Sequence, residues 1–145
     1  MPVGHARAED AASDATLARR ADEAEARYRS LVDVLQGVTY VEELDSGRTL
    51  SISPQIERML GYTPEEWMGD ASRWKRSLHP LDRDRVVAAC DRANESREPF
   101  AAEYRMLHRD GRVVHIRDVA VLVRGSDGHP LCWQGVMTDV GPPVA

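Results

Sequence analysis

Apolar residues near the N-terminus recur at alternating intervals of four and three, which is the spacing of a coiled-coil seam. The seam residues are Leu17, Ala21, Ala24, Tyr28, Leu31 and Leu35. No glycine or proline occurs between Asp14 and Gln36, and charged residues fill most of the other positions. The pattern predicts an amphipathic helix over residues 14–36. Two interpretations are open: the helix dimerises through its seam, which we favour, or it packs alone on its own domain.

The rest of the chain alternates between strand and short-helix patterns. Two β-branched segments at 38–41 and 49–52 flank an Asp-Ser-Gly turn and predict a hairpin. Short helices are expected at 55–60, from residue 63, at 72–78 and at 82–96, and strands at 100–108, 112–123 and 130–140. The turns between the last three strands end in Gly111 and Gly128, which favours hairpins. This order is typical of α+β organisation and not of a parallel α/β repeat.

Local signals mark the ends of several of these helices. Thr63 is followed by a proline and two glutamates. In a helix that starts here, Thr63 is the N-cap, the proline takes the first helical position and the two acids lie in the first turn. Asp82 is expected to cap the longer helix that follows it. His79 precedes a proline and is therefore disfavoured in helical geometry, so the segment before it should end there.

Composition and charge narrow the class of protein. The chain has 145 residues, of which 42% are hydrophobic and 30% charged, and this fits one soluble domain with one core. Its net charge of −5 makes it a poor binder of nucleic acid or of an anionic membrane. No apolar segment approaches the roughly 18 residues of a membrane span, and residues 1–9 lack the apolar centre of a secretory signal. We therefore expect a cytoplasmic protein with two free cysteines and with neither nucleic-acid nor membrane partners.

Four short motifs occur in one order between residues 61 and 139. They are GYTPEEW at 61–67, LHPLDR at 78–83, EYR at 103–105 followed by DG at 110–111, and WQGVMTD at 133–139. With these motifs in this order, the chain resembles a PAS domain of the kind found in bacterial multi-sensor proteins. The resemblance implies an α+β PAS fold: a five-stranded antiparallel sheet with short helices on one face and an N-terminal amphipathic helix.

The patterns and the resemblance divide the chain into four segments. We expect a flexible tail at 1–13, a coiled-coil-like helix at 14–36, the PAS domain at 37–140 and a C-terminal tail at 141–145. PAS relatives usually continue into a helix that leads to an effector, but Gly141 and the two prolines after it cannot continue a helix. Two proposals are open: a free-standing module, or a fragment of a larger sensor.

In a PAS fold, one face of the sheet and the short helices enclose a pocket, and strand alternation indicates which residues face it. The candidate pocket residues are Ile52, Leu60, Trp67, Trp74, Leu78, Val87, Tyr104, Met106, Ile116, Asp118 and Met137, and Trp133 and Gly135 share the side of Met137. Asp118 is the one polar residue that alternation turns inward, towards a ligand donor, whereas a β-bulge would rotate it to solvent. The competing interpretation of the whole set is a plain hydrophobic core. We expect any ligand to be small and mainly apolar or aromatic.

The resemblance also bears on cofactors. Flavin-binding relatives carry a cysteine close to the position of Lys75 and polar amides at the positions of Met106, Ile116 and Met137, where apolar side chains would leave the flavin edge unpaired. Haem-binding relatives commonly take an iron ligand from a histidine on the long helix, but residues 83–96 contain none. No histidine has metal-ligand spacing with a cysteine or carboxylate. We therefore predict no flavin, haem or metal, which leaves an unidentified small molecule.

The opposite face of the sheet is expected to be too apolar for an open surface, so the N-terminal helix, a second subunit or both should cover it. The candidate dimer-interface residues are Leu17, Tyr28, Leu31, Leu35, Leu107, Val119, Val121 and Val136. In PAS proteins this face is the usual dimer surface. We therefore expect a homodimer, and the resemblance implies an effector protein as a further partner.

No catalytic motif occurs in the sequence. There is no Gly-x-Ser-x-Gly segment and no phosphate-binding glycine loop, and the helix dipole explains Glu65 and Glu66 without chemistry. The sequence therefore predicts a non-enzymatic sensory module that dimerises and binds a small ligand in its pocket. The alternative is a pure protein–protein interaction module whose core is filled by its own side chains.

Overall fold

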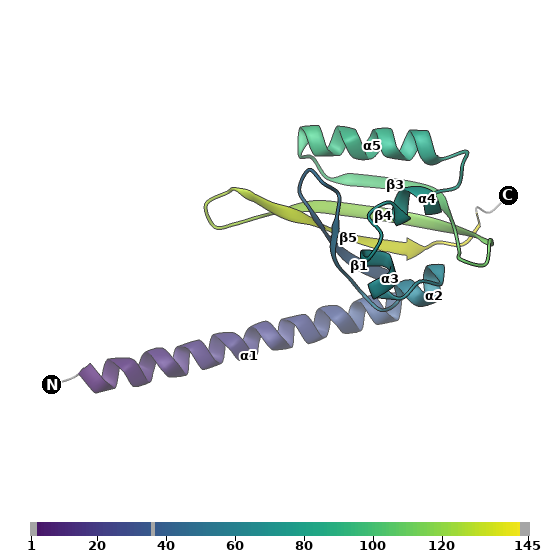
Figure 1. The fold of residues 1–145 in the computed structure, drawn as a ribbon. Helices are drawn as coiled ribbons and strands as arrows, with labels where there is room; N and C mark the ends of the chain where they lie inside the picture. Colours follow the sequence, from purple (N-terminus) through teal and green to yellow (C-terminus); the bar gives the residue numbers. More distant parts are fainter. Residues whose placement is uncertain (1–2, 36, 143–145) are drawn as a thin grey trace. The chain divides into compact units, whose positions relative to one another are not determined.

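The computed structural model describes residues 3–35 and 37–142, and the side chains of residues 12–31 and 37–142. The chain divides into two compact units, residues 1–34 and 35–145, and each is described by itself. The first unit is a single helix, and the second contains the sheet (Figure 1). Among the described residues, no helix combines the length and the apolar character that crossing a membrane requires.

The N-terminal unit is the helix α1, Val3–Leu35. It begins at Val3 and not at Asp14, so residues 3–13, which we expected to form a flexible tail, are helical. Residues 5–13 include four alanines and neither glycine nor proline, and this composition favours the longer helix. Of the seam residues, Leu17, Tyr28 and Leu31 are exposed, and the side chain of Leu35 lies outside the described residues.

The second unit is built on one antiparallel sheet (Figure 1). Its strands are β1 (Gly37–Glu43), β2 (Thr49–Ile52), β3 (Phe100–Leu107), β4 (Val113–Arg124) and β5 (Pro130–Asp139). They lie in the order β2-β1-β5-β4-β3, so the N-terminal hairpin pairs with the last strand of the chain. This arrangement confirms the predicted α+β fold with five antiparallel strands.

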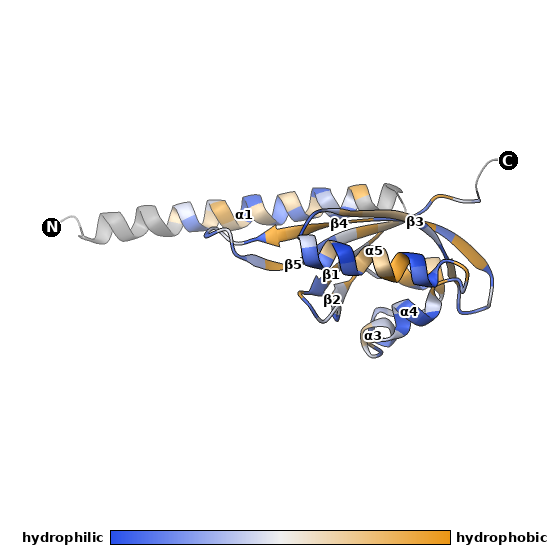
Figure 2. Ribbon diagram, turned by 90° about the horizontal axis from the view of Figure 1, so that it is seen from above, coloured by the Kyte–Doolittle hydropathy of each residue, from blue (hydrophilic) through white to orange (hydrophobic). Residues whose placement is uncertain are grey.

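Four helices occur in the chain between β2 and β3. They are α2 (Ile56–Leu60), α3 (Pro64–Met68), α4 (Arg73–Ser77) and α5 (Arg83–Ser96). Figure 2 shows α3, α4 and α5 on the same side of the sheet. Leu78, directly after α4, forms a β-bridge with Met106 of β3, and α5 packs against the same strand. The helices therefore cover one face of the sheet, as predicted.

The hydrophobic core lies between these helices and the inner face of the sheet. Alternation along the last three strands places Tyr104, Met106, Ile116 and Met137 inward, as the sequence predicted. All four residues are buried, and Met106 and Ile116 are fully so. The sheet thus presents an apolar inner face to the helices.

Thr63 caps α3 as predicted. Its hydroxyl accepts a hydrogen bond from the N–H of Glu66 at 3.1 Å, and the Glu66 carboxylate accepts one from the N–H of Thr63 at 3.2 Å. The two bonds form a capping box. Arg109, in the turn between β3 and β4, pairs with Glu66 and donates to the carbonyl of Gly61 at 3.2 Å. These bonds attach the β3–β4 turn to the start of α3.

Asp82 does not cap α5 with its side chain, contrary to our prediction. Its carboxylate instead accepts bonds from Nε and Nη2 of Arg105 at 3.0 and 2.8 Å, and from the backbone N–H of Arg105 at 2.9 Å. These bonds hold the pKa of Asp82 well below its usual range. A guanidinium binds a carboxylate more strongly than an uncharged N–H does, so the contact with β3 displaces the cap. The interaction joins the start of α5 to the sheet.

The outer face of the sheet is apolar where the sequence predicted it. Val119 and Val121 are exposed, at 41% and 47%, while Leu107 and Val136 are partly buried. The two valines are therefore exposed apolar side chains on the outer face, which also carries the ion pair of Arg117 with Glu103 at 2.8 Å.

Candidate ligand-binding site

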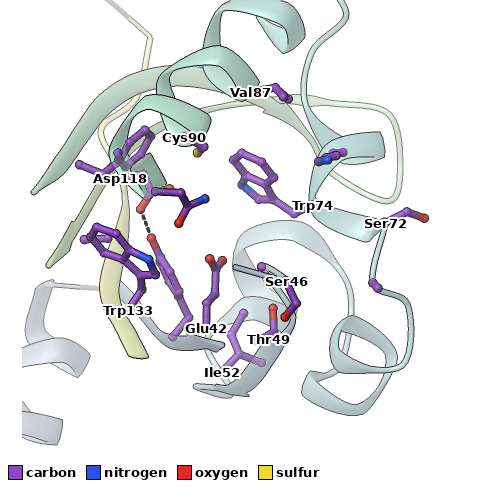
Figure 3. A pocket seen from close by; sticks show the side chains of 18 of the residues that line it. Glu42, Ser46, Thr49, Ile52, Ser72, Trp74, Val87, Cys90, Asp118 and Trp133 are labelled. Carbon is purple, nitrogen blue, oxygen red and sulfur yellow. Dashed lines mark hydrogen bonds between the residues drawn. The ribbon is translucent and has the colours of Figure 1, made fainter. Parts of the chain in front are cut away.

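A cavity of about 350 Å³ lies between the inner face of the sheet and the helices α4 and α5 (Figure 3). Its wall includes the predicted pocket residues Ile52, Trp67, Trp74, Val87, Asp118 and Met137. The other predicted pocket residues are buried in the adjoining core and do not line the wall: Leu60, Leu78, Tyr104, Met106 and Ile116. The volume is within the range of small-molecule sites. The sheet and the helices therefore leave a partly open cavity, whose rim includes exposed residues such as Ser46 and Ser72.

The sequence interpretation missed two polar wall residues on β1. Tyr40 and Glu42 share the inner face with Val38, because side chains alternate along the strand. The alternation rule that identified the inner residues of the last three strands also identifies these two. Phe100 and Asn94 line the cavity as well, from β3 and α5.

Asp118 lies on β4 with its side chain inward and is 3% exposed. The strand has no bulge at this point, since Asp118 pairs in register with Ala102 on one side and Met137 on the other. The hydroxyl of Tyr40 donates to Oδ1 of Asp118 at 2.6 Å, and the hydroxyl of Tyr104 donates to Oδ2 at 2.7 Å. Of the two orientations considered for Asp118, the inward one is therefore correct.

The network around Asp118 continues to the helices. Nε1 of Trp74 donates to the hydroxyl of Tyr104 at 3.2 Å, and the two rings meet edge to face with centroids 6.2 Å apart. Residues of β1, β3, β4 and α4 are thus joined by three consecutive hydrogen bonds. A fully paired buried network of this kind fixes the positions of its members.

Burial changes the acid–base properties of the cavity wall. It raises the pKa of Asp118 to about 6, although the hydrogen bonds from Tyr40 and Tyr104 oppose the rise. It raises the pKa of Glu42 to about 7, with a smaller contribution from the charge of Asp118. Burial, followed by the charges of Asp118 and Glu42, also raises the pKa of the Cys90 thiol to about 12. Cys90 is therefore protonated at neutral pH, which does not suit a nucleophile.

The wall is more acidic than the sequence predicted. It includes the carboxylate residues Glu42, Asp45, Asp70, Asp91 and Asp118 and a single basic residue, Lys75. Arg97 pairs with Asp45 at 3.0 Å, and Arg76 pairs with Asp70. The remaining three acids have no ion-pair partner among residues 37–142. The expectation of a mainly apolar environment is corrected accordingly, because β1 and α5 bring acidic side chains to the wall.

The residues considered for cofactors lie at different depths. Met137 and Lys75 line the cavity, whereas Met106 and Ile116 are buried in the core. None of the three apolar side chains carries a hydrogen-bond donor that a flavin ring could use. Among the described residues, no group of three histidine, cysteine, aspartate or glutamate side chains is placed to hold a metal ion.

A family model described as PAS fold matches residues 49–137. The match extends from β2 through the four helices to β5, and it includes much of the cavity wall. The chain belongs to the PAS fold family, and the resemblance noted from its sequence motifs is confirmed.

Three similar proteins have names that mention a sensor or a sensory box. The chain is 33% identical over 82 residues to the methyl sulfide methyltransferase-associated sensor of Methanosarcina acetivorans, covering 56% of this chain. It is 34% identical to the N-terminal domain of a diguanylate cyclase with PAS/PAC sensor from Marinobacter aquaeolei, with a TM-score of 0.65 over 72% of this chain and 94% of that chain. A sensory box histidine kinase/response regulator from Burkholderia thailandensis is 26% identical, with a TM-score of 0.62 over 79% and 84% of the two chains. The chain spans only 8% and 14% of the lengths of the curated relatives that it matches.

Proposed function

We propose that this chain is a non-enzymatic sensory module that binds a small molecule in the cavity beside β1, β4 and β5. The observation that carries the proposal is the cavity of about 350 Å³ next to the hydrogen-bonded network of Asp118. Relatives named as sensors support it. Neither Cys90 nor Asp118 offers a nucleophile or a free base, because the Cys90 thiol is protonated and both carboxylate oxygens of Asp118 accept hydroxyl hydrogen bonds. Binding itself would then be the signal.

The signal would leave the cavity through β1. Tyr40 and Glu42 reach the cavity from this strand, which begins at Gly37, two residues after α1 ends at Leu35. A ligand that moves either side chain would shift a strand that is hydrogen-bonded to both β2 and β5. Packed elements switch between discrete arrangements, so a small displacement of β1 can be passed along the chain to the helix.

We also propose that the module forms a homodimer. Leu17 and Leu31 on the seam of α1 are exposed, and so are Val119 and Val121 on the outer face of the sheet. Burial of such apolar surfaces against a second copy would remove them from water and stabilise the assembly. An effector protein would receive the signal in the cytoplasm, and a net charge of −5 favours a protein partner over nucleic acid.

The alternative function is a pure interaction module whose cavity holds only solvent. One observation favours it: Leu60, Leu78, Met106 and Ile116 are fully buried beside the cavity. The domain thus has a close-packed core that does not need a ligand for its stability.

Native mass spectrometry of the protein purified from its own host separates the two functions. We expect a bound species of constant additional mass in the wild type. Ala93→Leu should abolish it, because Ala93 lines the cavity from α5 and a larger side chain there occupies the space of the ligand. Ala88→Leu is the matched control, since Ala88 is exposed on the same helix. Repeated ligand-free spectra of the wild type would contradict the sensory function and favour the interaction module.

A further inference from the structure

Two polar groups without partners face the cavity from neighbouring strands. Glu42 on β1 is the register partner of Trp133 on β5, so the two residues lie opposite each other on the inner face, and Figure 3 shows both side chains at the cavity. The Glu42 carboxylate makes no hydrogen bond or ion pair with residues 37–142. The indole Nε1 of Trp133 has no acceptor, although the residue is only 5% exposed. Because buried polar groups are nearly always paired, this corner of the cavity is suited to a polar ligand.

The charged residues of the wall indicate whether the ligand is an anion or a cation. Glu42 and Asp118 lack a cationic partner among residues 37–142, and Lys75 is the single basic residue of the wall. No wall residue is an arginine, although all but one of the chain's 19 basic residues are arginines. Carboxylate and phosphate ligands are usually bound by arginine. An anion would therefore find little to bind in the cavity, whereas a cation would compensate the charge of the half-buried Glu42.

Aromatic rings form much of the remaining wall. Tyr40, Trp74, Phe100 and Trp133 reach the cavity from β1, α4, β3 and β5. The face of an aromatic ring attracts cations through its quadrupole, and tryptophan does so most strongly. The same rings pack well against an apolar or aromatic body. Carboxylates beside aromatic rings are thus a suitable environment for an organic ammonium or amidinium group.

We propose that the cavity binds a small organic cation. Its amine or amidinium nitrogen pairs with Glu42 near Asp118, and its apolar or aromatic body packs against Trp74 and Trp133. An acceptor atom of the ligand would satisfy Nε1 of Trp133. This inference rests on the proposed sensory function and narrows it to one chemical class of ligand. It also replaces the mainly apolar ligand expected from the sequence.

Calorimetric titration of the full chain with three aromatic probes of similar shape tests the inference. Benzamidine is a cation, benzamide is uncharged and benzoate is an anion. At about pH 8, where Glu42 is largely ionised, benzamidine should bind at least about tenfold more tightly than benzamide, and benzoate should not bind. Glu42→Gln should weaken benzamidine binding about tenfold and leave benzamide binding unchanged. Glu43→Gln is the matched control, because Glu43 is the next residue of β1 and is exposed.

Each other result overturns the inference in a distinguishable way. Equal binding of benzamidine and benzamide to the wild type would exclude selection of a cation but would leave the ligand-binding function intact. Tighter binding of benzoate would reverse the expected sign. If none of the three probes binds, the proposal that the cavity binds an organic cation is also wrong. Native mass spectrometry would then test the sensory function independently, since it assumes no ligand class. The comparison of probes on the wild type does not depend on the folding of any variant.

Discussion

Tyr40 and Gly135 are register partners on β1 and β5, and the phenol ring of Tyr40 occupies the space that a side chain at residue 135 would need. A Cβ atom on Gly135 would lie 2.7 Å from Cε1 of Tyr40 and closer still to the hydroxyl end of the ring. With glycine there, the ring crosses β5 and its hydroxyl donates to Asp118 on β4 at 2.6 Å. A glycine inside a strand often marks such a close approach. The missing side chain thus allows a hydrogen bond between residues of two strands that are not neighbours.

Gly135→Ala should therefore destabilise the domain. The added methyl group would displace the Tyr40 ring and break its bond to Asp118, at a cost of about 1–3 kcal/mol in the free energy of unfolding. Chemical denaturation measures this cost. In a Tyr40→Ala background the same substitution should cost close to nothing, and an equal cost in both backgrounds would contradict the steric explanation.

Tyr40→Phe should raise the pKa of Asp118 above its value of about 6. The hydroxyl stabilises the ionised carboxylate, so its removal favours the protonated form. Tyr104→Phe should act in the same direction, because its hydroxyl bonds the other carboxylate oxygen. A carbon-13 NMR titration of the Asp118 carboxyl group measures both effects. Tyr28→Phe, at an exposed position of α1, is the control and should leave the titration unchanged.

Glu42 should make the domain less stable as the pH rises. Its pKa is about 7 in the folded domain against an ordinary value of 4.5, so the folded state holds the proton more tightly than the unfolded chain does. The resulting stability is complete below about pH 4.5 and is lost as the pH rises through about 7, a change on the order of 3 kcal/mol.

Denaturant titrations of Glu42→Gln at two pH values check this prediction. The variant should be more stable than the wild type at about pH 8 and should lose that advantage at about pH 4, where Glu42 is protonated in both states. Asp91, Asp118, Tyr40, Cys90 and Lys75 also surround the cavity and are present in both proteins. The charge of Asp118 contributes to the raised pKa of Glu42, so this coupling is part of the difference that is measured. A difference that does not vary with pH would contradict the raised pKa of Glu42.

Asp82→Asn should weaken the connection between α5 and β3. The amide cannot reproduce the charge-assisted bonds with Arg105, and we expect a loss of about 1–3 kcal/mol at neutral pH. Arg105 lowers the pKa of Asp82, so this contribution is present above the ordinary aspartate range and is lost as the pH falls below it. Thermal unfolding at neutral and acidic pH measures the loss. Asp84→Asn, exposed in the first turn of the same helix, should have a much smaller effect.

Val121→Asp should prevent the proposed homodimer without unfolding the monomer. Val121 is 47% exposed in the single chain, so a carboxylate there is solvated in the monomer but would be buried unpaired in an interface. Sedimentation velocity measures the oligomeric state. Leu81→Asp is the control, because Leu81 is 78% exposed in the segment before α5. A dimer that persists in Val121→Asp would place the interface elsewhere.

The predictions from strand alternation and from the capping box at Thr63 agree with the structure. Met106 and Ile116 are buried because side chains alternate along a strand wherever that strand lies, and Thr63 forms its capping box with a residue three positions away. Asp82 failed as a cap because Arg105, 23 residues further on, offers its carboxylate a stronger partner. No local signal near Asp82 reveals that competitor.

Fold class and the inner and outer faces of the strands can thus be established from the chain's own periodicity, because backbone geometry over a few residues sets the direction of each side chain. Packing in three dimensions settles the rest of the site. The bond from Tyr40 to Asp118 joins residues 78 positions apart, and it depends on the register that places Gly135 beneath the ring. The cavity and the unpaired carboxylate of Glu42 likewise result from how the sheet and the helices pack. The periodicity of the sequence does not predict them.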